Sequence, residues 1–164
     1  MTFIDRLTGL IGLSARVLNV FQPLAALAGR LFVCEAFLRS GWLKISDWEQ
    51  TLGLFENEYH VPVLPPHVAA VAGTFGELFF PLLVLFGFCG RIGAVGLSFV
   101  NVMAVVSYSD VLLNQYPAGG FQHLGWGIVL LALAVYGPGQ ISVDHLLTRG
   151  RRADAVTTAS TAAY

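Results

Sequence analysis

Four ionisable side chains lie inside long apolar stretches of this sequence. Arg30, Glu35 and Arg39 fall within one stretch, and Glu77 falls within the next. A charge at the centre of a membrane-spanning helix costs about 2.5 to 3.5 kcal/mol on insertion scales. Such residues need partners, and they are candidates for proton exchange or substrate binding by default. The sequence therefore predicts a buried charged cluster made of these four residues.

Depth along the helix axis indicates how the cluster pairs. Glu35 and Glu77 each lie about 20 Å from the inner end of their stretch at 1.5 Å per residue. On adjacent antiparallel helices their carboxyl groups then sit at similar depth. Either Arg30 or Arg39 is expected to neutralise Glu77, and Glu35 and Arg39 form an i, i+4 pair on one face. Because Arg30 points about 140° away from Glu35, Arg30 is the arginine better placed for Glu77.

Pro81 marks the surroundings of Glu77 as unusual. A proline cannot donate a hydrogen bond to the carbonyl four residues earlier, which here belongs to Glu77, so the helix should bend or loosen there. The small residues Ala69, Gly73 and Gly76 allow a neighbouring helix to approach closely. Two interpretations stay open at this point, namely a structural Arg–Glu clasp and a proton-binding or substrate-binding site.

A second group of polar residues lies in the outer half of the apolar stretches: His67, Asn101, Tyr108 and His123. Asn101 is expected to hydrogen-bond across helices. The two histidines lie near the ends of their stretches, where a hydrogen bond at the interface is their usual role. Neither HxxH nor ExxH spacing is present, so we predict no metal site.

The elements that must position these residues are long apolar segments. Hydrophobic residues make up 55% of the chain and charged residues 12%, against roughly 25% charged in soluble domains. Each segment approaches the roughly 20 residues that cross about 30 Å of hydrocarbon. We predict an all-α, integral membrane four-helix transmembrane bundle with spans at about 22–43, 67–90, 91–111 and 121–138.

The segments outside these spans have distinct patterns. Residues 1–21 show apolar residues at helical spacing and predict an amphipathic helix in the membrane interface, with Pro23 starting the next helix. Residues 44–66 predict a polar loop, Gly90 and Arg91 a tight reversal, and residues 112–120 a turn-rich linker. The membrane domain is expected to cover 22–146, followed by a disordered cytoplasmic tail at 147–164.

Charge asymmetry predicts the orientation. In a four-span arrangement one side carries most of the arginines, and the other side has only Lys44 among its loop residues. The arginine-rich side should face the cytoplasm, which places both termini inside and the acidic 44–66 loop outside. The net charge of −1 implies no attraction to nucleic acid. The arginines on the predicted cytoplasmic side are Arg6, Arg16, Arg91, Arg149, Arg151 and Arg152.

Four segments in order resemble the DoxX family of small bacterial membrane proteins, over roughly residues 24–146. The first span reads LAGRLFVCEAFLRSGWLKISDW, and the loop into the second reads EYHVPVLPPHVAA. The second span and its exit read TFGELFFPLLVLFGFCGRIGA, and the chain after the fourth span reads GPGQISVD.

The resemblance implies a four-span protein of the bacterial inner membrane. Some members of the family are subunits of thiosulfate:quinone oxidoreductases, and others are linked to redox defence complexes. Arg30, Lys44, Glu77 and Arg91 occupy polar positions that the family shares. Glu35 and Arg39 are additions to that pattern, and the resemblance implies no catalytic set.

Three hypotheses for function follow. The first is an accessory subunit of a quinone-linked membrane redox system, with quinone as the candidate cofactor and a membrane or periplasmic redox protein as the partner. The second is a carrier or channel for protons or a small solute, which four short spans would allow only in a homo-oligomer. The third is a structural membrane scaffold for a partner protein, in which each buried charge fixes helix packing.

Overall fold

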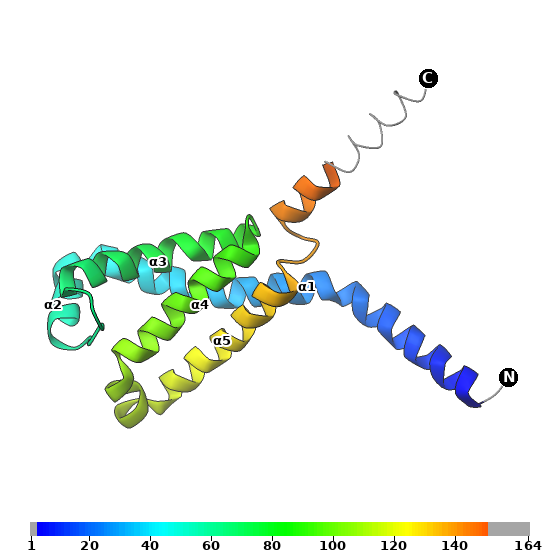
Figure 1. Cartoon of the computed structure of the whole chain (residues 1–164), viewed down its shortest axis with the longest axis horizontal. Helices are drawn as coiled ribbons and strands as arrows, with labels where there is room; N and C mark the ends of the chain where they lie inside the picture. The colour runs from blue at the N-terminus through cyan, green and yellow to red at the C-terminus, as the bar shows by residue number, and fades with distance from the viewer. Residues whose placement is uncertain (1–2, 151–164) are drawn as a thin grey trace, which may run out of the picture.

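The computed structural model describes residues 3–150, and within that range the chain is helical with no strand (Figure 1). Among these described residues, four helices are long and apolar enough to cross a membrane, and they pack against one another as a bundle. The all-helical membrane fold expected from the sequence is thus confirmed. The elements are α1 (Phe3–Ser46), α2 (Trp48–Asn57), α3 (Pro66–Phe86), α4 (Gly90–Ser107), the π-helix η1 (Val111–Gln115) and α5 (Pro117–Tyr136).

The bundle is held together by packing of α3 on α4, α4 on α5, and α1 on α3. Its apolar core takes residues from all four long helices, among them Phe37, Val84, Leu97 and Leu130. One polar contact lies within this core, where the thiol of Cys34 donates to the carbonyl of Pro81 at 3.2 Å. That contact joins α1 to α3.

The helix boundary predicted at Pro23 is wrong, because α1 continues through this residue from Phe3 to Ser46. Pro23 only removes one hydrogen bond within the helix, and no glycine or cap ends the helix before it. The part of α1 before Pro23 projects beyond the bundle, and α1 bends where it leaves the other helices (Figure 1). The location of residues 1–21 in the membrane interface stays a prediction.

The polar loop predicted at 44–66 contains a helix. Asp47 caps α2 by accepting a hydrogen bond from the backbone N–H of Gln50 at 3.0 Å. The buried face of α2 carries Thr51 and Phe55, and Phe55 packs on Ala70 of α3. The buried residues Thr51 and Phe55 have the i, i+4 spacing of an amphipathic helix. The many acidic residues of this segment favoured the prediction of a loop instead.

The turn between α3 and α4 lies at residues 87–89, just before the predicted reversal at Gly90 and Arg91. Gly87 and Cys89 both have positive φ, at 62° and 48°. The carboxylate of Asp144 accepts hydrogen bonds from the backbone N–H groups of Cys89 at 2.8 Å and Gly90 at 2.9 Å. A side chain 54 positions away in sequence therefore caps α4, and local sequence patterns carry no sign of such a cap.

Two other predicted boundaries also change. The linker expected at 112–120 is mostly helical, because η1 occupies Val111–Gln115 and α5 already begins at Pro117. After α5 the chain turns at Gly137 and Gly139, as expected from the GlyProGly sequence, and residues 143–150 are helical. The disorder predicted from residue 147 is therefore wrong up to 150, and the rest of that tail lies outside the described residues.

Candidate functional site

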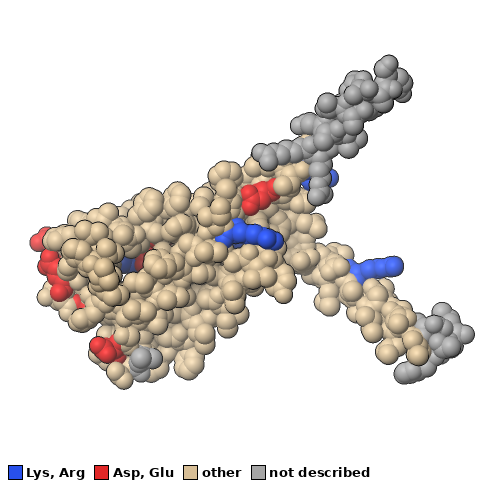
Figure 2. All heavy atoms as spheres, viewed as in Figure 1, with Lys and Arg blue, Asp and Glu red and all other residues tan. Residues whose placement is uncertain are grey.

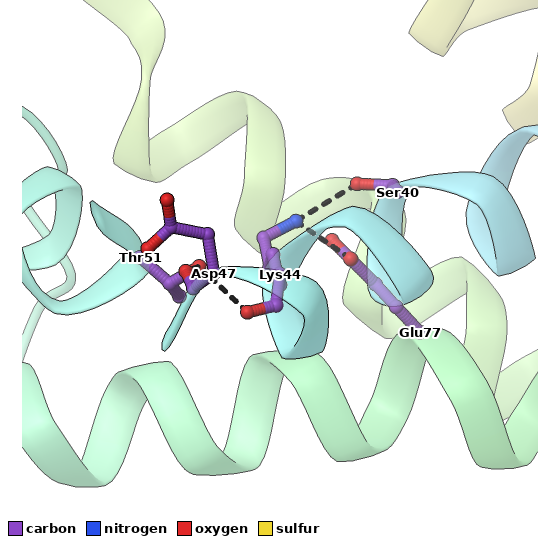
Figure 3. A network of polar contacts seen from close by, with 5 residues as sticks. All are labelled: Ser40, Lys44, Asp47, Thr51 and Glu77. Atoms are coloured by element: carbon purple, nitrogen blue, oxygen red, sulfur yellow. Dashed lines mark hydrogen bonds and ion pairs between the residues drawn. The ribbon is translucent and has the colours of Figure 1, made fainter. Parts of the chain in front are cut away.

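The most buried ion pair in the described chain joins Lys44 at the end of α1 to Glu77 in the middle of α3. The Lys44 Nζ lies 2.6 Å from Glu77 Oε2 and donates a second hydrogen bond to Ser40 Oγ at 2.8 Å (Figure 3). The two side chains are 13% and 10% exposed. A charge-assisted hydrogen bond of this length in a bundle interior is a strong one.

Local geometry brings the pair together. Ser40 and Lys44 are one helical turn apart on α1, so they share a face. Gly41 lies between them where α1 and α3 approach closely, since a Cβ there would stand 2.8 Å from the side chain of Leu78 and 3.2 Å from Glu77 Cβ. A glycine at 41 thus lets the two helices come close enough for the pair to form.

The turn from α1 into α2 holds Lys44 in place. The hydroxyl of Thr51 lies 2.9 Å from the carbonyl oxygens of both Lys44 and Asp47. Asp47 is in turn fixed as the cap of α2. Figure 3 shows these residues side by side, with the ion pair on one side of Lys44 and the α2 cap on the other.

A second polar contact joins α4 and α5. Asn101 Nδ2 donates to the carbonyl oxygen of His123 at 3.0 Å, and Asn101 Oδ1 lies 2.8 Å from His123 Nδ1. With the amide in this orientation, His123 Nδ1 is the donor. The expected hydrogen bond of Asn101 across helices is therefore confirmed. Lys44 is near enough for its charge to act on the His123 imidazole.

Two tyrosines, Tyr59 and Tyr108, pack against each other at the end of the bundle beside α2. The rings of Tyr59 and Tyr108 meet edge to face at 4.9 Å, and the Tyr108 hydroxyl donates to Glu58 Oε2 at 3.2 Å. Burial, followed by the charges of Tyr108, Glu77 and Glu58, raises the pKa of Tyr59 to about 12. A cavity of about 390 Å³ opens next to this layer, with Glu58, Tyr108 and Asp110 in its lining.

Arg30 lies at the opposite end of the bundle and does not pair with Glu77, which corrects the sequence prediction. It is 1% exposed, and its Nη2 donates to the backbone carbonyl of Ile141. A Cβ at Gly87 would touch its guanidinium, and Gly87 is ten residues, or about 15 Å, beyond Glu77 on α3. Its Nε and Nη1 atoms have no hydrogen-bond partner within the described residues.

Glu35 and Arg39 are also outside the cluster predicted for them, because they lie on the outer face of α1. Their side chains are 69% and 76% exposed, and the closest approach between the two charged groups is 4.0 Å. The level predicted for Glu35 is also wrong, because its neighbour Cys34 contacts Pro81, which lies one turn beyond Glu77 on α3. The direction of each side chain around the helix depends on where the other helices pack. The buried cluster of four charges therefore does not form.

His67 lies at the start of α3 and pairs with Glu56 of α2, with 3.3 Å between His67 Nε2 and Glu56 Oε1. Both side chains are largely exposed. Within residues 3–150, His, Cys, Asp and Glu side chains form no group of three or more that could hold a metal ion.

Lys44 is the residue that sequence reasoning from spacing alone missed as a partner for Glu77. The apolar stretch ends at Leu43, which places Lys44 in the predicted outer loop, whereas α1 continues to Ser46. Two signals pointed to it, namely the i, i+4 relation with Ser40 and the position shared with other members of the resembling family.

Helices long enough to span a membrane, with a buried ion pair between two of them, define a multi-pass helical membrane protein. The DoxX family model matches residues 25–110, which is more than half of the chain. The protein therefore belongs to the DoxX family. Both members of the Lys44–Glu77 pair lie inside the matched range. Neither a curated protein nor a solved structure matches the chain.

Proposed function

We propose that this DoxX protein is an accessory membrane subunit of a quinone-linked redox system, with Lys44 and Glu77 as its proton-exchanging site. The observation that carries the proposal is the buried ion pair itself, with 2.6 Å between its charged atoms. Ionisable groups inside membrane helices are characteristic of proton relays and substrate sites.

The pair can bind and release a proton through a simple change in charge. Protonation of Glu77 removes the negative charge that holds Lys44, and the Lys44 ammonium then keeps Ser40 as its hydrogen-bond partner. A bound quinone supplies a head group that takes up two electrons and two protons when it is reduced. Lys44 would donate a hydrogen bond to the oxygen of such a head group, and Glu77 would exchange protons with it.

The pair offers a head group with two oxygen atoms both a hydrogen-bond donor and a proton-exchanging carboxylate. An ammonium and a carboxylate are the polar groups of the pair, and the ring of Tyr59 is close enough for the Glu77 charge to act on it. The surface beside α2 is hollowed, with charged atoms at the floor of the hollow (Figure 2). The small but measurable exposure of both side chains is consistent with access from this end.

The same proposal includes a location and a partner. Acidic residues gather at the α2 end of the molecule, whereas the basic residues on the surface in view lie towards the other end, where an acidic patch accompanies them (Figure 2). This distribution supports an inner-membrane protein with its α2 end outside and its termini in the cytoplasm. A membrane or periplasmic redox protein that docks at the α2 end would supply the electrons.

Quinone content tests the proposal directly. The protein is purified in mild detergent, and co-purifying quinone is quantified by mass spectrometry for the wild type, Glu77→Gln and Glu49→Gln. Glu49 lies exposed on α2, so Glu49→Gln is the matched control for the same chemical change. We expect near-stoichiometric quinone in the wild type and in Glu49→Gln, and its loss from folded Glu77→Gln. No quinone in the wild type would contradict the proposal.

A structural scaffold is the second candidate, and the completeness of the pair favours it. Lys44 has two hydrogen-bond acceptors, and Gly41 packs the helices tightly around it. A scaffold predicts that Glu77→Gln lowers the unfolding temperature while quinone content is low and equal in every variant.

The carrier hypothesis is tested with the same preparations, because proton flux into proteoliposomes that is unchanged by Glu77→Gln would contradict it.

A further inference from the structure

One face of α1 carries exposed residues at a regular spacing. They follow one another at alternating intervals of three and four residues, which is the spacing of a helix–helix seam. Two of them are small, two are aromatic, and two carry opposite charges. The residues of this face, which we call the α1 seam, are Ala25, Ala28, Phe32, Glu35, Arg39 and Trp42, and each is exposed.

The charged residues of the α1 seam lie at the depth of the apolar core. Cys34, the neighbour of Glu35, donates to Pro81, which is five residues, or about 8 Å, from the end of α3. Arg39 lies another turn deeper, beside Gly41, which contacts Leu78. Both charges therefore face the hydrocarbon in a single copy of the protein.

Their mutual contact does not compensate for this position. The distance of 4.0 Å between the charged groups of Glu35 and Arg39 exceeds hydrogen-bond length. Within residues 3–150, neither group has another charged partner. A charge at the centre of a spanning helix costs about 2.5 to 3.5 kcal/mol on insertion scales. Binding of a surface that supplies an opposite charge to both Glu35 and Arg39 would therefore be strongly favoured.

We propose that the α1 seam is the interface between two copies of this chain, related by a two-fold axis along the membrane normal. In such a pair the Glu35 of each copy meets the Arg39 of the other, so the seam is complementary to itself. Residues 35 and 39 differ by about 6 Å in height. Long side chains cross that height between helices packed about 8 to 10 Å apart.

The rest of the α1 seam fits this arrangement. Ala25 and Ala28 allow two α1 helices to approach closely on the arginine-rich side of the bundle, as small residues do in membrane helix pairs. Phe32 and Trp42, which are 58% and 65% exposed, stand on either side of the charged residues. The interface would bury both aromatic side chains and exclude lipid from the charges.

Charge exchange tests the interface. The fluorescently labelled protein is reconstituted in lipid vesicles at a series of protein-to-lipid ratios, and dimers are counted by single-molecule photobleaching. Glu35→Arg and Arg39→Glu each create like charges across the axis, and we expect each to weaken dimerisation by roughly a hundredfold or more. The double exchange Glu35→Arg/Arg39→Glu restores opposite charges, so its dimerisation should return to within about tenfold of the wild type.

Cysteine cross-linking provides an independent measurement. In a Cys89→Ala background, Ala28→Cys should form a disulfide-linked dimer on mild oxidation. Ile128→Cys on α5 is the matched control, because this residue is similarly exposed at 62% but lies on another helix. Equal cross-linking at both positions would overturn the assignment of the interface.

Three other results would overturn the proposal. These are a wild type that is monomeric at every ratio, single exchanges that leave the dimer unchanged, and a double exchange as weak as the single ones. If an arginine at position 35 prevents insertion, Glu35→Gln replaces it, with an expected weakening of about tenfold. An unchanged dimer in Glu35→Gln would then contradict the pairing of Glu35 with Arg39 of the second copy.

Discussion

The Nζ atom of Lys44 and the carboxylate of Glu77 lie 2.6 Å apart although 33 positions separate them in the sequence. The contact joins the end of the first membrane helix to the centre of the second. Because both side chains are nearly buried, the loss of either one leaves an uncompensated charge in the bundle.

We therefore expect Lys44→Met and Glu77→Gln each to lower the free energy of unfolding by about 3 to 5 kcal/mol. The double variant should lose less than the sum of the two, since neither charge is left alone. Chemical unfolding in detergent, arranged as a double-mutant cycle, measures the coupling. Additive effects would show that the pair contributes no coupling energy.

The sequence predicts those features of the site that depend on residue type and order, and it does not predict those that depend on how the helices pack. The long apolar segments and the burial of Glu77 follow from residue types and their order, and Asn101 joins α4 to α5 as expected. The partner of Arg30 is a backbone carbonyl, that of Ile141, which has no signature in a sequence. The outward direction of Glu35 depends on which face of α1 packs on α3 and α5, and that is a property of the whole bundle.

Close packing at the α3–α4 turn leads to a second prediction. A Cβ at Gly93 would lie 2.7 Å from Leu83 Cβ and 3.1 Å from the backbone nitrogen of Val84. Gly93→Ala should therefore lower stability by about 1 to 3 kcal/mol, as overpacking does. The matched control is Gly125→Ala, where no atom lies within 4 Å. This control should be neutral or stabilising by up to about 1 kcal/mol.

The raised pKa of Tyr59 predicts an alkaline effect on stability. Its pKa of about 12 in the folded protein lies above the usual value of 10, so the unfolded chain loses this proton first. The corresponding stability is fully present below pH 10 and is lost as the pH rises through about 12. Unfolding measured across this range should show a smaller loss for Tyr59→Phe than for the wild type.

Two further variants sharpen that measurement. Tyr136→Phe removes a tyrosine that is 78% exposed and is the control for the substitution itself. Glu77→Gln removes one of the charges that raise the pKa of Tyr59. A titration of tyrosinate absorbance should therefore show Tyr59 ionising at lower pH in Glu77→Gln, and an unchanged titration would contradict the effect of the Glu77 charge on Tyr59.

The proposed orientation can be tested through the exposed thiol of Cys89. This residue lies in the turn between α3 and α4, whereas Cys34 is buried. With the termini in the cytoplasm, a membrane-impermeant maleimide should label Cys89 in inverted vesicles and leave it unlabelled in intact spheroplasts. Glu49→Cys in a Cys89→Ala background should show the opposite pattern. Labelling of Cys89 from outside would reverse the orientation.

The cap that Asp144 provides for α4 has a consequence for the order of synthesis. The N–H groups of Cys89 and Gly90 receive this carboxylate only after the whole of α5 and the turn behind it have left the ribosome. The Arg30 guanidinium likewise lacks its acceptor, the carbonyl of Ile141, until this segment has been synthesised. Nascent chains that carry the first three long helices alone therefore expose two incomplete polar sites at one membrane surface, and the segment from Ile141 to Asp144 completes both of them.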